Sequence, residues 1–228
     1  MEALKVFIGY DPRQPLAYNV LQHSIVRHAS KPVAITPLIL GQLPLKRRGL
    51  TEFTFSRFLV PYLCDFQGKA LFLDADMAVT GDIASLFDAC DVIGGAVFVM
   101  RKQQQFEWAS AMLFNCSRCI KLRPEWIEDE DNNPFDLQWA QQVGDMPEEW
   151  NHCVGYAPTR TDASLYHYTQ GLPCWPETKG LQEDAIWLAE RDAMLASVSW
   201  EELMGQSVHA KHVLHRFLRK YKYFQHLT

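Results

Sequence analysis

The apolar and polar positions along this chain predict short buried strands separated by helices and polar loops. Apolar runs of strand length lie at Leu4–Gly9, Val33–Leu40, Ala70–Leu73, Val92–Val99, Ala111–Phe114 and Leu165–His167. Helices are predicted at Leu16–His28, Thr51–Leu63, Ile83–Asp88, Asp136–Val143 and Glu183–Leu195. The acidic segment 123–136, which contains two prolines, is expected to be an exposed loop. The opening order of strand, helix and strand predicts an α/β fold that binds ligands at the carboxyl ends of its parallel strands.

The run Ala70–Leu73 is followed at once by Asp74, Ala75 and Asp76. Residues two apart in an extended chain point to the same side, so both carboxylates can converge at the end of a buried strand. Like charges placed there lose hydration and repel each other. A divalent cation with a preference for oxygen ligands, Mg²⁺ or Mn²⁺, would stabilise them. The alternative is that the two residues only end the strand and cap the next turn.

Three further features point to ligand binding. Gly9, Tyr10 and Asp11 follow the first strand and offer close backbone approach, a ring for stacking and an acceptor for a nucleotide base, although they also fit an ordinary loop. No GxGxxG phosphate fingerprint is present. Arg57 lies among apolar residues and needs an anion, either a protein carboxylate or a ligand phosphate. His167 ends a short apolar strand, where it can ligate a metal or be a hydrogen-bonded core histidine.

Composition narrows the class of protein. A chain of 228 residues can build one sizeable core, and a formal net charge of −5 argues against nucleic acid as a partner. No apolar stretch reaches the roughly 20 residues of a membrane span, and the N-terminus lacks a signal-peptide pattern. The six cysteines, including the pair Cys116 and Cys119, are expected to be reduced thiols. We therefore expect a single cytoplasmic domain spanning residues 1–228.

The C-terminal segment 209–228 is basic and rich in aromatic residues. Such a tail either docks on the body as a helix or rests on an anionic membrane surface. If the tail rests on a membrane, the protein would be located at the inner face of that membrane.

Taken together, the ordered motifs resemble the GT-A glycosyltransferases, in particular family 8 and its small bacterial relatives. The resemblance covers the chain to about Trp175 and rests on Thr54–Phe58, the Asp74–Asp76 pair, Ala111–Asn115 and His167–Trp175. It implies a Rossmann-like nucleotide-diphospho-sugar transferase fold with a mostly parallel central sheet flanked by helices. It also implies a UDP-sugar donor, Mn²⁺ or Mg²⁺, and transfer with retention of configuration.

The resemblance also assigns roles to residues, in three sets. The metal ligands would be Asp74, Asp76 and His167, and Asp76 would serve catalysis through the metal. The donor would be bound by Gly9, Tyr10, Asp11, Arg57, Ala75 and Gly171. The acceptor, a sugar, a lipid or a protein, would lie near Asp136 and Gln138.

The chain departs from the family pattern at three places. The family's DQD segment has no clean counterpart, and Asp136 and Gln138 are only partial matches to it. The family's HxxGxxKPW motif runs here from His167 to Trp175, with its glycine one place late and its phosphate-binding lysine missing. Lys179 is the candidate replacement. The acidic residue expected after the strand Val92–Val99 is replaced near Arg101 and Lys102.

Two alternatives remain. A haloacid-dehalogenase-type phosphatase also has a strand ending in DxD, but this chain has Ala78 where that class usually has Thr or Val. The second is a nucleotide-binding or membrane-docking module without catalysis.

Overall fold

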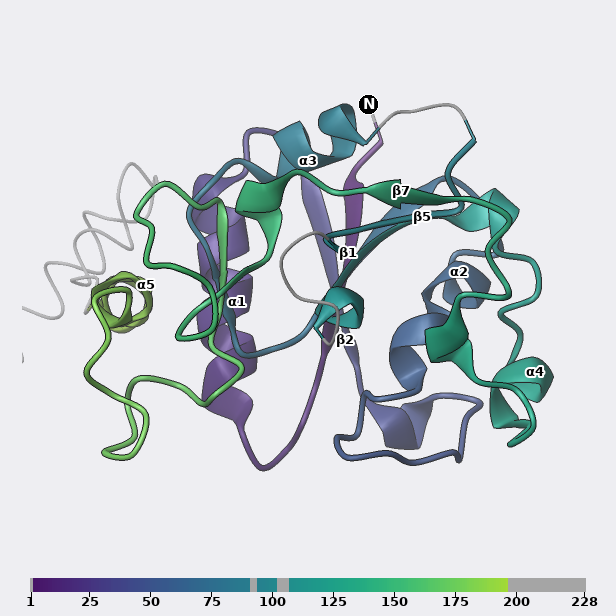
Figure 1. The fold of residues 1–228 in the computed structure, drawn as a ribbon, viewed down its shortest axis with the longest axis horizontal. Coiled ribbons are helices and arrows are strands. Elements are labelled where there is room, and N and C mark those ends of the chain that lie inside the picture. Colours follow the sequence, from purple (N-terminus) through teal and green to yellow (C-terminus); the bar gives the residue numbers. More distant parts are fainter. Residues whose placement is uncertain (1, 91–93, 102–106, 197–228) are drawn as a thin grey trace, which may run out of the picture. The chain divides into compact units, whose positions relative to one another are not determined.

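The computed structural model describes residues 2–90, 94–101 and 107–196, and its main feature is a six-stranded sheet of order β2-β1-β3-β6-β5-β7 (Figure 1). Its strands are β1 (Leu4–Gly9), β2 (Val33–Leu38), β3 (Lys69–Leu73), β5 (Val97–Val99), β6 (Ala111–Asn115) and β7 (Val143–Asp145). The pairs β1–β2, β1–β3 and β5–β7 are parallel, whereas β6 is antiparallel to both β3 and β5. Five strands therefore run in one direction, which confirms the predicted mostly parallel sheet.

A second, three-stranded sheet has the order β4-β9-β8. Its strands are β4 (Met77–Val79), β8 (His152–Cys153) and β9 (Leu165–His167). The described helices are α1 (Pro15–His28), α2 (Val60–Leu63), α3 (Ile83–Ala89), α4 (Pro124–Glu128) and α5 (Asp184–Leu195). The predicted α/β class, with helices flanking the sheet, is confirmed.

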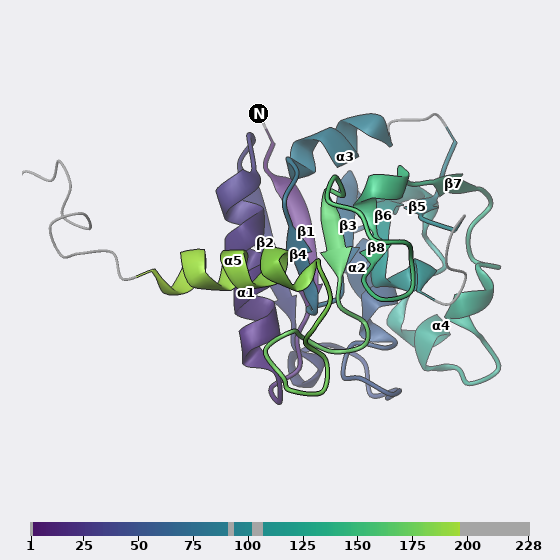
Figure 2. The same ribbon diagram turned by 60° about the vertical axis from the view of Figure 1, so that its left-hand side comes forward.

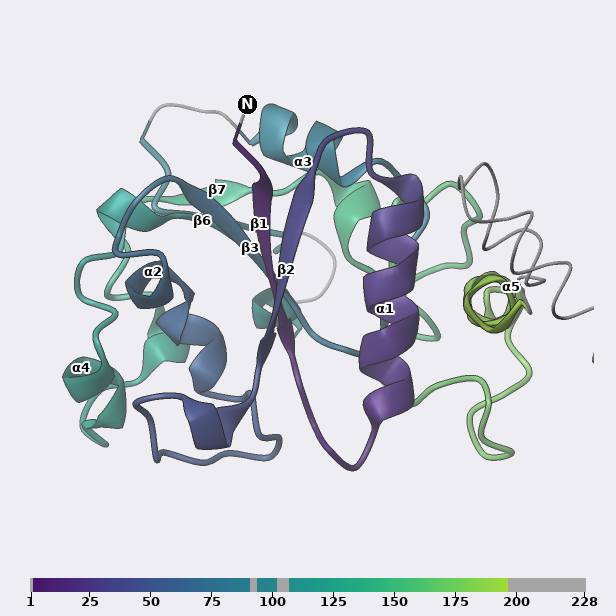
Figure 3. The same ribbon diagram turned by 180° about the vertical axis from the view of Figure 1, so that it is seen from behind.

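Both faces of the central sheet are buried, because alternate residues of each strand pack on opposite sides. Leu71 and Leu73 of β3 pack in one apolar cluster together with the apolar face of α1. Phe72, between them, packs in the other cluster with α2 and α4. Figures 1 and 3 show α1 on one side and α2 and α4 on the other. Continuous apolar runs rather than strict alternation are what strands buried on both faces require.

Helix α5 crosses α1, as Figure 2 shows. Its buried Glu190 accepts a hydrogen bond from Arg27 Nη1 at 2.9 Å and lies 3.0 Å from His28 Nε2. Trp187 is fully buried in the same apolar cluster as α1. The predicted helices 16–28, 83–88 and 183–195 are thus found within one or two residues of their bounds.

Two predicted helices are wrong. In the segment Thr51–Leu63, the Thr54 hydroxyl accepts a hydrogen bond from the backbone of Thr51, so turns replace the first part. A 3₁₀ helix at Ser56–Leu59 and the short α2 follow. The segment Asp136–Val143 contains no α-helix, because Leu137 adopts a left-handed conformation (φ 58°) that ends the preceding 3₁₀ turn.

Other bounds also differ from the sequence-based expectation. The acidic segment 123–136 contains α4 and a 3₁₀ turn at Pro134–Asp136 rather than only loop. Strand β2 ends at Leu38, and β5 occupies only Val97–Val99 of the predicted run. Residues 91–93, Lys102 and the tail 209–228 lie outside the described residues, so the docked and membrane-bound readings of the tail stay predictions. Among the described residues, no helix is long and apolar enough to cross a membrane.

Candidate active site

The site lies at the edge of the sheet where the parallel strands end. Ile8 of β1 pairs with Leu73 of β3, so Gly9 and Asp74 leave the sheet side by side. Strand β6 runs the other way and pairs Ala111 with Leu73, so the residues just before Ala111 arrive at the same edge. The backbone N–H of Asp74 donates to the carbonyl of Ser110 at 2.8 Å.

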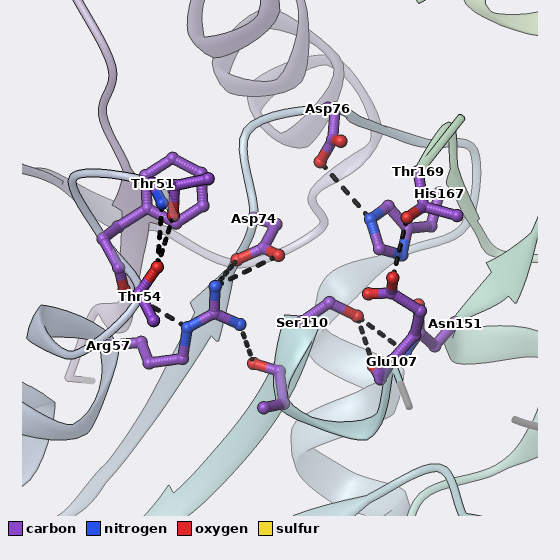
Figure 4. A network of polar contacts seen from close by, with 12 residues as sticks. Thr51, Thr54, Arg57, Asp74, Asp76, Glu107, Ser110, Asn151, His167 and Thr169 are labelled. Atoms are coloured by element: carbon purple, nitrogen blue, oxygen red, sulfur yellow. Dashed lines mark hydrogen bonds and ion pairs between the residues drawn. The ribbon is translucent and has the colours of Figure 1, made fainter. Parts of the chain in front are cut away.

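The small sheet brings His167 to the same place from far along the chain. Met77, the residue after Asp76, pairs with His167 across the antiparallel strands β4 and β9. The backbone N–H of Tyr168 donates to the carbonyl of Asp76 at 2.9 Å, which continues the pairing. As a result, His167 Nε2 lies 3.3 Å from Asp76 Oδ1 (Figure 4). The register of the short strands β4 and β9 therefore sets the position of His167 relative to Asp76.

Asp74, Glu107 and His167 form a group able to hold a metal ion. Their nearest ligand atoms all lie within 4.8 Å of one another. Asp76 borders the group through its contact with His167. Oδ1 of Asp74 is buried and accepts no hydrogen bond from any residue that the structure describes, although Arg57 Nη2 lies 3.1 Å from it. Carboxylate oxygens with one imidazole suit Mn²⁺ or Mg²⁺, so the residues present fit the implied ion.

The charges of the group explain why it would attract a cation. Burial raises the pKa of Asp74 to about 7, which the charges of Asp76 and Glu107 support and those of Arg57 and His167 oppose. Burial lowers the pKa of His167, but the charge and hydrogen bond of Asp76, together with Cys153, raise it well above its usual value. The raised pKa of His167 reflects the negative charge of Asp76, whereas that of Asp74 reflects mainly burial.

Arg57 forms an ion pair with Asp74. Its Nη2 lies 3.1 Å from Asp74 Oδ1, its Nη1 donates to the carbonyl of Ala109 at 2.8 Å, and its Nε donates to the carbonyl of Phe53 at 3.2 Å. The guanidinium also lies 5.1 Å from the centre of the Phe72 ring. The sequence left two possible anions for Arg57, a protein carboxylate or a ligand phosphate, and in the structure Arg57 pairs with a protein carboxylate. A contact of Arg57 with donor phosphates stays a prediction.

The predicted nucleoside-binding residues lie at the same sheet edge. The space beside the Cα of Gly9 is filled by the ring of Phe53, so this glycine allows close packing within the protein. Tyr10 packs edge-on against Tyr18, with ring centres 5.4 Å apart. Asp11 is buried and accepts hydrogen bonds from the Arg13 side chain, the shortest at 2.6 Å.

The remaining predicted residues are scattered. Ala75 is buried between the two aspartates. Gly171 has a left-handed backbone (φ 123°) that follows the strand of His167, and Lys179 is exposed further along that loop. Asp136 and Gln138 are exposed, and Asp136 accepts a hydrogen bond from Asn133 at 2.7 Å. Within the described part of the chain, no hydrogen bond or ion pair joins Asp136 or Gln138 to the metal-binding group.

Glu107 is the residue that the sequence reasoning missed. We expected an acidic residue shortly after the strand that ends at Val99 and found Arg101 there. Glu107 instead precedes the strand that starts at Ala111, and it reaches the site because that strand runs antiparallel to β3. The only signal in the sequence is its place four residues before an apolar run, which has no meaning until the strand direction is known.

Comparison with known proteins gives one curated relative and several solved structures. No family model matches the sequence. Protein CDI of Arabidopsis thaliana is 34% identical over an alignment of 227 positions, and this alignment covers 82% of this chain and 86% of that protein. The glycosyltransferase GlyE of Streptococcus pneumoniae TIGR4 superposes with a TM-score of 0.63 at 17% identity, over 86% of this chain and 62% of GlyE. The galactosyltransferase LgtC, in complex with donor and acceptor sugar analogues, superposes with a TM-score of 0.56 at 12% identity, over 87% of this chain and 98% of LgtC.

Proposed function

Because the chain belongs to the family of Arabidopsis thaliana Protein CDI and has the GT-A glycosyltransferase fold, we propose that it is a metal-dependent glycosyltransferase. The fold match confirms the GT-A resemblance, while membership of family 8 stays a prediction. The donor is a nucleotide-sugar, in our proposal a UDP-sugar, and the acceptor is a sugar, a lipid or a protein. The observation that carries the proposal is the convergence of Asp74, Glu107 and His167, with Asp76 beside them, where the parallel strands end.

We assign Asp74, Asp76 and His167 to the cation, Mn²⁺ or Mg²⁺. When bound, the cation offsets the negative charge that builds up on the departing nucleoside diphosphate. Arg57 holds the Asp74 carboxylate in place by an ion pair and is itself fixed by two backbone carbonyls. The geometry of the first aspartate therefore does not depend on the ligand.

The nucleoside would lie against Gly9, Tyr10 and Asp11, which leave the sheet beside the DxD strand. Arg13 holds the Asp11 carboxylate and so orients it. Lys179 is exposed on the loop after Gly171 and is our candidate for the phosphate-binding lysine that the motif lacks. Ala75 contributes backbone between the two metal-binding aspartates.

The acceptor side is the least defined part of the proposal. Asp136 and Gln138 are exposed and available to an acceptor hydroxyl. We also propose transfer with retention of configuration, which the family 8 resemblance implies. Proton NMR of the first product anomer formed from a defined UDP-sugar would show a change of configuration if this assignment is wrong.

The phosphatase alternative has less support. It needs Asp74 as a nucleophile with free access to phosphorus, whereas Asp74 is only 8% exposed and is paired with Arg57. The similar solved structures are glycosyltransferases. The other alternative, a catalytically inactive nucleotide-binding module, would have the same site but no turnover. A coupled assay for UDP release distinguishes it from a transferase, because only the transferase releases UDP from a UDP-sugar.

A first test is thermal stabilisation by UDP or a UDP-sugar, with and without Mn²⁺. Ligand at a hundred times its dissociation constant should stabilise the fold by about 2.7 kcal/mol, and only when the divalent ion is present. Equal stabilisation in EDTA would remove the metal from the proposal.

A second test separates transferase from phosphatase by titration calorimetry of UDP in the presence of Mn²⁺. His167→Ala and Asp76→Asn should each weaken UDP binding by about tenfold or more, because each removes a group that we place at the cation. Asp88→Asn, at an exposed aspartate paired with Lys31, is the matched control and should bind UDP normally. Unchanged UDP affinity in His167→Ala, with phosphatase activity lost only in Asp74→Asn, would support the phosphatase.

A further inference from the structure

Glu107 belongs to the metal-binding group, although it is not one of the predicted metal ligands. A DxD pair and a histidine already supply two carboxylates and an imidazole. Glu107 adds a third carboxylate, whose oxygen lies within 4.8 Å of the ligand atoms of Asp74 and His167. The carboxylates of Asp74 and Glu107 repel each other at this separation unless a cation or a proton lies between them, and Asp76 adds a further negative charge beside His167.

The backbone of Glu107 is fixed by three hydrogen bonds to one carbonyl. That oxygen accepts from the backbone N–H of Ser110 at 3.1 Å, from the Ser110 hydroxyl at 2.6 Å and from Asn151 Nδ2 at 3.1 Å. Ser110 and Asn151 are almost completely buried, and Asn151 also donates to the Ser110 hydroxyl at 3.0 Å. Glu107 is therefore anchored both within its own turn and to the segment that leads into β8 (Figure 4).

The side chain of Glu107 is oriented as well. Its Oε1 accepts a hydrogen bond from the Thr169 hydroxyl at 2.7 Å, and Thr169 stands two residues after His167. One carboxylate oxygen is thus held by the turn that follows β9, the strand that supplies the imidazole. The position of Glu107 relative to His167 is set by the protein itself, before any ligand enters.

A second observation points to a cation at this place. Asp74 is more than nine-tenths buried, and its Oδ1 accepts no hydrogen bond within the described structure, although Arg57 Nη2 is 3.1 Å away. A buried carboxylate oxygen of this kind is rare unless an ion or a water is its partner. Asp74 belongs to the group that includes Glu107, so its Oδ1 atom, which accepts no hydrogen bond from a described residue, and the oriented carboxylate of Glu107 can face the same ion.

We propose that Glu107 is a further protein ligand of the cation, and that the chain binds the divalent ion before the nucleotide arrives. A site with only two carboxylates and a histidine relies on the donor diphosphate for more of the coordination. Here three carboxylates and an imidazole, held by Thr169, Asn151 and Arg57, supply most of the oxygen ligands in advance. This inference rests on the proposed metal-dependent transfer and concerns the order in which its ligands bind.

The test is titration of Mn²⁺ into the nucleotide-free protein, followed by the electron paramagnetic resonance signal of free Mn²⁺. The wild type should bind one Mn²⁺, and Glu107→Gln, which keeps the hydrogen bond from Thr169, should weaken this affinity at least tenfold. Thr169→Val should cause a smaller loss, because it frees the carboxylate without removing it. Glu125→Gln makes the same change at an exposed position of α4 and should match the wild type.

The same titrations repeated with UDP keep the two proposals apart. Mn²⁺ that binds only together with UDP, or equally to wild type and Glu107→Gln, overturns the role of Glu107 but leaves the proposed function intact. Glu107-dependent Mn²⁺ binding with no binding of UDP or of any UDP-sugar supports the cation site and contradicts the proposed function. Circular dichroism of each variant establishes that it is folded, and Thr169→Val tests the arrangement if Glu107→Gln does not fold.

Discussion

Two arginine–aspartate pairs in this chain have the same separation and different surroundings. Arg57 Nη2 lies 3.1 Å from Asp74 Oδ1 with both side chains about one-tenth exposed, and Arg101 Nη2 lies 3.1 Å from Asp145 Oδ1 with both about half exposed. Replacing each arginine by methionine keeps an unbranched apolar stem and removes only the guanidinium. The comparison therefore isolates the effect of burial on a charge pair.

The structure sets the expected magnitudes. Arg57→Met leaves Asp74 without its cation and the carbonyl of Ala109 without the Arg57 donor, while the Phe53 carbonyl keeps the backbone N–H of residue 57 at 3.3 Å. Breaking a buried pair in this way costs about 3–5 kcal/mol. Part of the loss at Asp74 is offset because burial already raises the pKa of that carboxyl to about 7, so it can take up a proton. Arg101→Met should cost less than about 1 kcal/mol, because water screens the exposed pair.

Urea unfolding in EDTA, followed by circular dichroism, measures both variants against the wild type. At roughly 2–4 °C per kcal/mol for a domain of this size, Arg57→Met should also melt about 6–20 °C lower. A loss of less than about 1 kcal/mol in Arg57→Met, or equal losses in the two variants, would refute the view that Arg57 is the structural partner of Asp74.

Two other predictions test the packing and the electrostatics. A Cβ on Gly9 would lie 2.6 Å from Cδ2 of Phe53, so Gly9→Ala should lower the free energy of unfolding by about 1–3 kcal/mol. Gly41→Ala, with open space around the new Cβ, should not lower it. Equal effects of the two substitutions in a urea titration would contradict this prediction. Burial lowers the pKa of His152, whose Nε2 lies 3.3 Å from Glu183 Oε1. The imidazole therefore takes up its proton at a higher pH in the unfolded chain than in the folded one, so the free energy of unfolding falls as the pH drops below about 6.5. His152→Gln should flatten that fall between pH 6.5 and the lower, folded-state pKa, and an unchanged slope of the urea midpoint against pH would rule out His152 as its source.

The sequence by itself determined the parts of the fold that depend on neighbouring residues. Helix α1 and strand β3 lie where the apolar pattern predicts them, because helical and extended periodicity are local properties of the chain. That Asp74 and Asp76 directly follow the end of a buried strand was likewise readable from the apolar run before them. Where local rules failed, a specific cause is visible, such as the left-handed Leu137 that ends the predicted helix from Asp136.

Only the tertiary structure decided which distant groups complete the site. His167 reaches Asp76 because β4 and β9 pair in one register, and a shift by one residue would turn the imidazole to the other face of the small sheet. Glu107 reaches Asp74 because β6 runs against β3, and nothing in the sequence of either strand states that direction. The reason is physical: periodicity reports which face of an element is buried, whereas pairing and direction are chosen by the free energy of packing all elements at once.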